Sequence, residues 1–192
     1  MTMDNLQGSR INGGNSSTGR RASDFYPTPP EATVSLLKFL SLPTRTHIWE
    51  PACGDGHMVN VMEAMGYEVT GTDIQAGDDF LTIPLTDCDW IITNPPFSLS
   101  GEFIRRCMGH KKPFALLLKA QFWNAAKRRR LFEDSKPDWF LPLTWRPDFT
   151  GKGQAMMDMA WCIWSFAPRG TTYFLPLERP STKEMEMLEG MK

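Results

Sequence analysis

The segment Asn94-Pro95-Pro96-Phe97 follows an apolar run and combines residue types that could hold an amino group for reaction. Two prolines fix φ and donate no hydrogen bond, so the chain leaves the preceding strand rigidly, with its carbonyl oxygens free to accept. The Asn94 side-chain oxygen and the Pro95 carbonyl would be two fixed acceptors, and Phe97 offers a flat apolar face. The segment therefore predicts a site that accepts hydrogen bonds from a planar amine.

A second candidate site lies upstream, in the segment WEPACGDGH at 49–57. Glu50 ends a predicted strand, and Gly54 and Gly56 form the turn onto the next helix, where glycine lets the backbone approach a ligand closely. A dinucleotide-binding fingerprint requires a third glycine three positions after Gly56, and Val59 stands there instead. The turn therefore favours a cofactor without a pyrophosphate.

Acidic residues accompany the next predicted strand, YEVTGTDI at 67–74. Asp73 ends this strand about 20 residues after Glu50, where an acid can bind both hydroxyls of a ribose. Asp79 then offers an acceptor for an exocyclic amine, and Phe80 offers an aromatic face for a purine. For each residue alone, a loop cap for Asp73 and a core position for Phe80 are competing interpretations. Together, in this order, they predict an adenosine site.

The elements that must position these residues alternate between strand and helix. Apolar or β-branched runs predict early strands, and segments of helical spacing lie between them. The strands are expected at 46–50, 67–74, 88–94 and 113–120, the helices at 57–66, 99–109 and 124–134, and three late strands without helices between them at 138–145, 159–167 and 171–178. This order predicts an α/β fold with a doubly wound, mostly parallel sheet and an antiparallel C-terminal hairpin at its edge.

The 192 residues, 41% of them hydrophobic, suffice for one domain with a substantial core. We expect a single catalytic domain at 24–178. The segment 1–23 is rich in Gly, Ser and Asn and predicts a flexible arm, and 179–192 predicts a polar tail with at most a loose helical turn.

Several classes of protein are excluded by what the chain lacks. It has no apolar run of about 18 residues and no apolar signal segment at its start, so we expect no membrane partner and a cytoplasmic location. Four cysteines without a C-x-x-C pair, and three histidines, predict neither a metal site nor disulfides. A net charge of -1 argues against a protein that coats polyanions, but leaves room for a local basic face. Candidates for that face are Arg105, Arg106, Lys111 and Lys112, and the run Lys127, Arg128, Arg129 and Arg130.

Taken together, these segments resemble the class I S-adenosylmethionine-dependent methyltransferases. EPACGDG at 50–56 resembles their glycine motif, TDI at 72–74 their ribose motif and DDF at 78–80 their adenine motif, while DFYPTPPEA at 24–32 is similar to a cofactor-binding segment of DNA adenine methyltransferases. A proline-rich loop that starts a helix is the competing interpretation of 24–32. The resemblance implies a Rossmann-like fold and S-adenosylmethionine as the cofactor. The residues that it implies for cofactor binding are Tyr26, Pro27, Thr28, Glu50, Ala52, Cys53, Gly54, Gly56, Asp73, Ile74, Asp79 and Phe80.

The NPPF segment resembles the [DNS]-P-P-[YFW] motif of amino methyltransferases, in the gamma-type motif order of DNA adenine methyltransferases. Compact phage enzymes of this kind share R-P-x-F at 146–149 and W-x-x-W at 161–164. The resemblance implies transfer of a methyl group to adenine N6 in DNA, in a bacterial or phage-infected cell, with Asn94, Pro95, Pro96 and Phe97 as the catalytic segment. Two acceptors for the N6 hydrogens would aim the nitrogen lone pair at the methyl group, and Phe97 would stack on the flipped base.

Contacts with DNA have several candidates along the chain, because no residues remain for a separate target-recognition domain. Specificity could come from the loop 144–158, from the arm with Arg10, Arg20 and Arg21, or from a partner. Trp145 or Phe149 could form a second face for the base, with core packing as the competing interpretation. The run Lys127 to Arg130 could contact phosphates or form a solvated helix face. Gln121, Phe122 and Trp123 could line the base channel or pack.

Three other functions stay open on the sequence. An RNA base methyltransferase or a protein glutamine methyltransferase could use the same NPPF site. A relative that binds nucleic acid or cofactor without turnover is the third. The target sequence, the preferred strandedness and the oligomeric state are left undetermined by the sequence.

Overall fold

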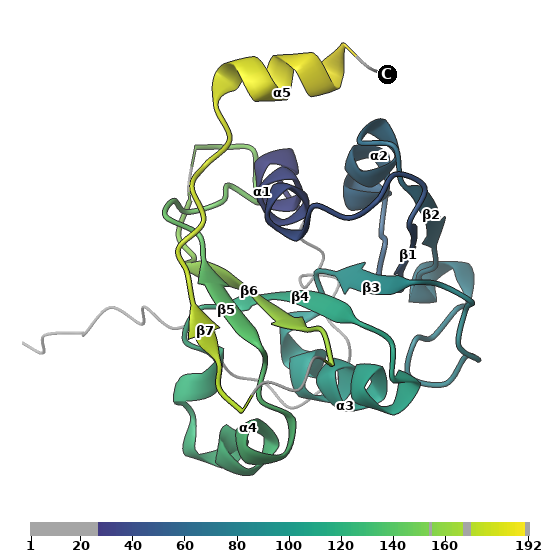
Figure 1. Ribbon diagram of the computed structural model, residues 1–192, viewed down its shortest axis with the longest axis vertical. Helices are drawn as coiled ribbons and strands as arrows, with labels where there is room; N and C mark the ends of the chain where they lie inside the picture. Colours follow the sequence, from purple (N-terminus) through teal and green to yellow (C-terminus); the bar gives the residue numbers. More distant parts are fainter. Residues whose placement is uncertain (1–26, 154, 167–169, 191–192) are drawn as a thin grey trace, which may run out of the picture.

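A computed structural model describes residues 27–153, 155–166 and 170–190. Tyr26, the arm 1–23 and its arginines lie outside these described residues. The chain folds around one seven-stranded sheet with the order β2-β1-β3-β4-β6-β5-β7 and helices on both faces (Figure 1). The first strands pair in parallel: β1 (His47–Glu50), β2 (Glu68–Gly71), β3 (Trp90–Thr93) and β4 (Phe114–Lys119). The predicted α/β, Rossmann-like fold class is confirmed.

The antiparallel part of the sheet lies inside it, and not at the edge where we expected it. β6 (Met159–Trp164) is antiparallel to both of its neighbours, β4 and β5 (Trp139–Pro142). All six residues of β6 are buried, and such a strand needs partners on both sides. The edge strand at this end of the sheet is β7 (Tyr173–Phe174), which is short, exposed and parallel to β5.

Helices α1 (Pro30–Leu40) and α2 (His57–Ala64) cover one face of the sheet, and α3 (Ser100–His110) and α4 (Arg129–Ser135) lie on the other (Figure 1). Pro30 starts α1, where the missing N–H costs nothing because the first helical N–H groups have no partner within the helix. The Trp161 indole N–H donates a 2.9 Å hydrogen bond to the Ala32 carbonyl. This buried contact ties α1, and the loop before it, to the centre of the sheet.

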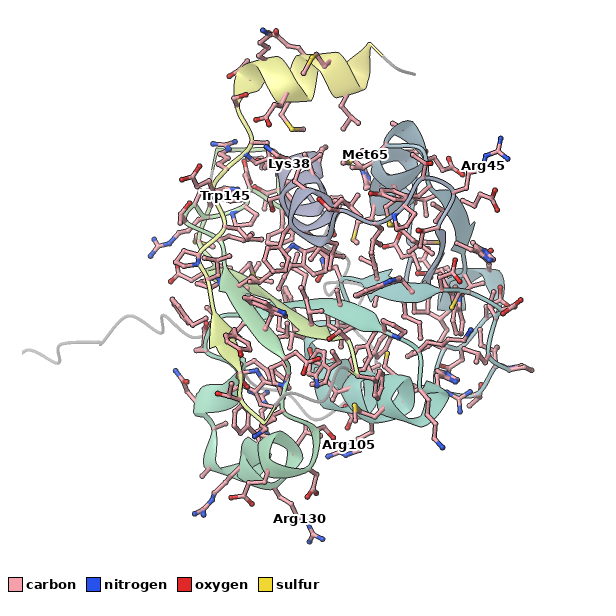
Figure 2. All side chains as sticks on the ribbon, viewed as in Figure 1. Lys38, Arg45, Met65, Arg105, Arg130 and Trp145 are labelled. Carbon is pink, nitrogen blue, oxygen red and sulfur yellow. The ribbon has the colours of Figure 1, made fainter. Side chains whose placement is uncertain are left out.

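The tail forms more than the loose helical turn that we expected. Helix α5 (Thr182–Glu189) begins with a capping box, in which Ser181 and Glu184 each bind the other's backbone N–H. Leu188 is buried against Val34 of α1 and Val61 of α2. Ion pairs join Arg179 to Glu31 and Glu184 to Lys38, which faces α5 in Figure 2. The tail thus packs on α1 and α2.

Most of the remaining predicted segments map onto observed elements, but the strand predicted at 171–178 is reduced to the two residues of β7. The basic segment 124–134 contains a 3₁₀ turn (Ala126–Arg128) that leads into α4. In the part of the chain that the structure describes, no helix is long and apolar enough to cross a membrane. Nor do three His, Cys, Asp or Glu side chains gather there closely enough to hold a metal ion. Cys53, Cys88, Cys107 and Cys162 are free thiols.

Candidate active site

A cavity of about 730 Å³ opens where β1, β2 and β3 end. Doubly wound sheets bind ligands at the carboxyl ends of their strands, because the loops diverge there. The cavity brings together nearly all of the described residues that were predicted for cofactor binding and catalysis, and none of those predicted for contacts with nucleic acid. Its walls include Pro27, Thr28, Glu50, Ala52, Cys53, Gly54, Asp73, Ile74, Asp79 and Phe80, and also Asn94, Pro95, Pro96 and Phe97.

The glycine turn is held in place by the acid after β2. Gly54 has a φ of 51°, in the left-handed region that glycine adopts most easily, and its N–H donates a 3.0 Å hydrogen bond to Asp73 Oδ2. The other oxygen, Oδ1, accepts from the Gln75 N–H at 2.8 Å. Asp73 therefore does cap a loop, as its competing interpretation held, but each oxygen keeps further lone pairs for a ligand.

Gly56 shapes the turn without reaching the cavity wall. Gly56 is the N-cap of α2, and its φ of 79° turns the chain into this helix. Gly56 is not among the residues that line the cavity. His57, the first residue of α2, lines the cavity instead, as do Gln75 and Asp78. His57 and Gln75 were not predicted, and Asp78 was predicted only as part of the DDF segment, although each is adjacent to a predicted site residue.

Glu50 is the most deeply buried acid of the cavity wall, with 2% of its surface exposed. Its Oε2 atom has no hydrogen-bond partner among the described residues. Burial raises the pKa of Glu50 to about 8, and the nearby charge of Asp73 raises the pKa further, against one backbone hydrogen bond that lowers it. Glu50 is therefore largely protonated at neutral pH until a ligand supplies a cation or a hydrogen bond.

The loop that carries Asp79 and Phe80 is clamped from α3. Phe80 is 2% exposed and packs against Trp49 and Phe103, with ring centroids 5.3 and 4.7 Å away, so it is a core residue that also lines the cavity. Arg106 Nε donates to the Phe80 carbonyl at 3.2 Å, and Arg106 Nη2 donates to the Ile83 carbonyl. Arg106 thus holds this loop and does not extend the basic face in which we had placed it.

Asn94 presents one atom of its amide to the protein and leaves the other without a partner. Its Nδ2 donates a 3.0 Å hydrogen bond to Thr28 Oγ1, and Thr28 is itself 5% exposed. Asn94 Oδ1 is buried and has no hydrogen-bond partner among the described residues. A buried acceptor without a partner is uncommon and points to a ligand donor.

Among the described residues, the carbonyls of Pro96 and Phe97 accept hydrogen bonds that turn the chain, whereas the Pro95 carbonyl accepts none. The Pro96 carbonyl accepts from the Leu99 N–H at 2.9 Å, and the Phe97 carbonyl accepts from Ser100 Oγ at 3.1 Å. These bonds build the 3₁₀ turn Phe97–Leu99 that leads into α3. No donor of the described residues binds the Pro95 carbonyl. Asn94 Oδ1 and the Pro95 carbonyl are therefore two unused acceptors on adjacent residues.

Phe97 contacts a cation and a second ring. Lys119 Nζ lies 4.6 Å from the centroid of the Phe97 ring. The Phe149 ring lies 6.5 Å away at an interplanar angle of 87°. Because the Phe97 and Phe149 rings are perpendicular, a base cannot stack on both of them in this arrangement. Trp145 packs against the core beside α1 and, like Phe149, is not part of the cavity wall (Figure 2).

The predicted basic run is spread over the surface of α4 and the turn before it, away from the cavity wall. Arg128 turns inward, where Nη1 donates to the Phe122 carbonyl and the guanidinium lies 4.0 Å from the Phe122 ring centroid. Arg129 and Arg130 pair with Glu133 and Asp134 one helical turn later, and Figure 2 shows Arg130 pointing away from the fold. This pairing fits the solvated-face interpretation of Arg129 and Arg130.

The segment Gln121 to Trp123 packs more than it lines a channel. Phe122 is buried, and Trp123 contacts Phe122 and Phe132 at centroid distances of 4.8 and 5.2 Å. Gln121 is exposed. None of the three belongs to the cavity wall, so the packing interpretation holds for both aromatic residues.

Solved structures with the same fold are methyltransferases. The methyltransferase subunit of a type I restriction-modification system from Streptococcus thermophilus aligns with 90% of this chain and 55% of its own, at 15% identity and a TM-score of 0.59. A putative class I S-adenosylmethionine-dependent methyltransferase from Listeria monocytogenes aligns with 90% of this chain and 73% of its own, also at 15% and 0.59. A putative RNA methyltransferase from Pyrococcus horikoshii aligns with 74% of this chain and 87% of its own, at 12% identity and a TM-score of 0.52.

These likenesses show that the chain has the class I methyltransferase fold. The chain spans about half the length of the restriction-modification subunit, 55%. No family model and no curated protein sequence matches this chain.

Proposed function

We propose that this protein transfers a methyl group from S-adenosylmethionine to the N6 amino group of adenine in DNA. The observation that carries the proposal is the pair of unused acceptors after β3, Asn94 Oδ1 and the Pro95 carbonyl, in the wall of the cavity. An exocyclic amine of a base has two N–H donors in one plane, which two acceptors on adjacent residues can take together. A rigid X-Pro-Pro backbone keeps them in place.

The cavity fits the proposed cofactor in size and in charge. A volume of about 730 Å³ suits a nucleoside-sized ligand, and the acids Glu50, Asp73 and Asp79 on the wall complement a cation. When bound, S-adenosylmethionine supplies an electrophilic methyl group on a positively charged sulfur. Asp73 would take the ribose hydroxyls, and the clamped loop with Asp79 and Phe80 would hold the adenine ring. Solved methyltransferases with this fold support the choice of cofactor.

The two acceptors would act on an amine that is a poor nucleophile, because its lone pair is delocalised into the purine ring. When Asn94 Oδ1 and the Pro95 carbonyl accept the N6 hydrogens, they favour tetrahedral geometry, which removes the lone pair from conjugation with the ring and localises it on nitrogen. Once nitrogen carries the methyl group it becomes acidic, and its extra proton can leave to water. Positioning and electrostatics then suffice, without a general base.

The choice of DNA as the substrate rests on one similar structure and on the order of the motifs. One of the similar structures is a subunit of a restriction-modification system, and the motif order resembles that of DNA adenine methyltransferases. The putative RNA methyltransferase among the similar structures makes RNA the second candidate. A base inside a duplex would have to be flipped into the cavity before it could reach Asn94.

The experiment that tests the proposal offers radiolabelled S-adenosylmethionine with matched pools of DNA, RNA and protein to the purified protein. We expect label in DNA, and we expect the Asn94→Ala variant to lose it. Asn60→Ala is the matched control, because Asn60 is exposed on α2 and does not line the cavity. Calorimetry of S-adenosylhomocysteine binding shows that each variant still holds cofactor. Label in RNA or protein, or cofactor binding without transfer to any pool, would contradict the proposal.

A further inference from the structure

Lys119 stands beside the NPPF segment, although nothing in the sequence connects the two. It ends β4, whose first five residues are buried and whose last, Lys119, is half-buried. β3 ends at Thr93, which pairs with Leu116, so β4 continues three residues beyond that pair. Those residues extend roughly 10 Å along the strand and run beside the chain that leaves β3. This explains why the ammonium lies over the Phe97 ring.

The charge of Lys119 is not balanced by any carboxylate in the part of the chain that the structure describes. Among the described residues, no carboxylate oxygen lies within 4.0 Å of Lys119 Nζ. The acid on the neighbouring strand is Asp158, which precedes Met159, the register partner of Lys119. Arg146 Nε donates to Asp158 Oδ1 at 2.7 Å, and Arg146 Nη2 donates to Asp158 Oδ2 at 3.5 Å. The acid that precedes the strand partner of Lys119 is thus already paired with Arg146.

A cation in this place does not serve methyl transfer itself. The proposed donor is a cation, and a second positive charge beside the cavity would repel it. Contact with an aromatic ring stabilises an ammonium by about 1 kcal/mol, which does not replace a counter-ion. An ammonium kept half-buried without a carboxylate is best explained by an anion that arrives with the substrate.

We propose that Lys119 binds a backbone phosphate next to the target nucleotide while its ammonium rests on the Phe97 ring. This inference rests on the proposed function and deepens it, because it names the charged group by which the substrate is held. A phosphodiester belongs to a nucleic acid and is missing from a glutamine side chain. Lys119 would thereby place the strand so that its flipped base meets Phe97 and the two acceptors.

The test measures binding of a fluorescent DNA oligonucleotide by anisotropy, with S-adenosylhomocysteine present and over a range of salt concentrations. Lys119→Met keeps the apolar stem and removes the charge, and Lys119→Arg keeps a cation. Lys183→Met, on the exposed side of α5, is the matched control. We expect Lys119→Met to raise the Kd about tenfold and to lower the slope of log Kd against log salt by about 0.7 to 0.9. Lys119→Arg and Lys183→Met should stay within about twofold of the native protein.

A second experiment replaces single phosphates of the oligonucleotide, around the target base, with neutral methylphosphonates. One replacement should weaken binding to the native protein but not to Lys119→Met, because the contact is already lost in that variant. An equal penalty in both proteins, an unchanged salt slope, or no DNA binding by the native protein would overturn the inference. Binding is measured apart from methyl transfer, so the two claims fail separately. DNA that is methylated but bound without Lys119 would refute this inference alone, and DNA that is bound through Lys119 but never methylated would refute the proposed function alone.

Discussion

Asn94 is held by Thr28 across 66 residues of sequence, through a 3.0 Å hydrogen bond from Asn94 Nδ2 to Thr28 Oγ1. Because the nitrogen is committed to Thr28, the amide oxygen is the atom left for a ligand. Thr28 precedes α1, and Trp161 ties α1 to the sheet through the Ala32 carbonyl. The loop before α1 and the NPPF segment therefore form one rigid unit, in which Thr28 positions Asn94.

Removal of the Thr28 hydroxyl should slow turnover more than it weakens cofactor binding. Thr28→Val has nearly the same shape, but it frees the Asn94 amide to rotate away from its productive orientation. We expect kcat to fall by about five- to thirtyfold, as the loss of one buried hydrogen bond implies, while Thr28→Ser keeps most of the activity. Single-turnover kinetics beside calorimetry of S-adenosylhomocysteine separates the two effects. If Thr28→Val lost cofactor affinity with kcat unchanged, Thr28 would bind the cofactor and would not position Asn94.

Loss of the Arg106 clamp should weaken cofactor binding. Arg106→Met removes both hydrogen bonds to the Phe80 and Ile83 carbonyls, and the loop that carries Asp79 then becomes free to move. We expect the Kd for S-adenosylhomocysteine to rise about tenfold, measured by calorimetry. Arg106→Lys should not restore it, because one ammonium cannot reproduce the fork of the guanidinium.

Arg105→Met is the matched control for the clamp. Arg105 is the adjacent residue on α3, and its side chain is 63% exposed and 3.9 Å from Glu102. A surface pair of this kind contributes little, so this variant should bind cofactor as the native protein does. Equal losses from Arg105→Met and Arg106→Met would mean that general destabilisation of α3, and not the clamp, explains the effect.

The buried Glu50 should make the protein less stable as pH rises. The folded state raises the pKa of Glu50 from 4.5 to about 8, so between these values it binds a proton that the unfolded chain releases. This contribution is fully present below pH 4.5 and is lost as the pH rises through about 8. Glu50→Gln has no proton to lose. We expect the free energy of unfolding of Glu50→Gln, minus that of the native protein, to increase by about 1 kcal/mol per pH unit across this range.

Urea unfolding from about pH 5 to about pH 8 measures this difference. Glu63→Gln is the control, because Glu63 is exposed on α2. Parallel pH profiles for Glu50→Gln and the native protein would show that Glu50 is already ionised in the folded state.

A methyl group at Gly71 should disturb the glycine turn. A Cβ there would lie 3.1 Å from Val59 Cγ2 and 3.2 Å from both Cys53 Cβ and Cys53 Sγ, so the turn would have to shift. We expect Gly71→Ala to lower the free energy of unfolding by about 1 to 3 kcal/mol and to weaken cofactor binding. Gly109→Ala in α3 meets nothing within 4 Å and should stabilise the protein by about 0.5 to 1 kcal/mol. Equal stabilities of the two variants would contradict the close approach at Gly71.

Local sequence signals were enough to predict the elements that build the cavity. Apolar runs marked β1, β3 and β4, and residues at or just after the ends of strands, such as Glu50 and Asn94, necessarily meet at the same edge of a parallel sheet. The place of β6 could not be predicted in this way, because strand order depends on pairing between distant segments. Contacts between elements could not be predicted either, because no local sequence pattern signals the contact of Lys119 with Phe97 or the hydrogen bond from Arg106 to the Phe80 carbonyl. Helix α5 was underestimated because its polar composition conceals the few apolar residues that pack on α1 and α2.

The central claim is that Asn94 Oδ1 and the Pro95 carbonyl hold the N6 amine of adenine for methylation. The most direct measurement is mass analysis of the nucleosides from DNA treated with the protein and methyl-labelled S-adenosylmethionine, for the native protein, Asn94→Ala and Asn60→Ala. The account predicts N6-methyl-2′-deoxyadenosine from the native protein and from Asn60→Ala, and at least about a hundredfold less from Asn94→Ala. Label on another atom of DNA, or an undiminished yield from Asn94→Ala, would contradict it.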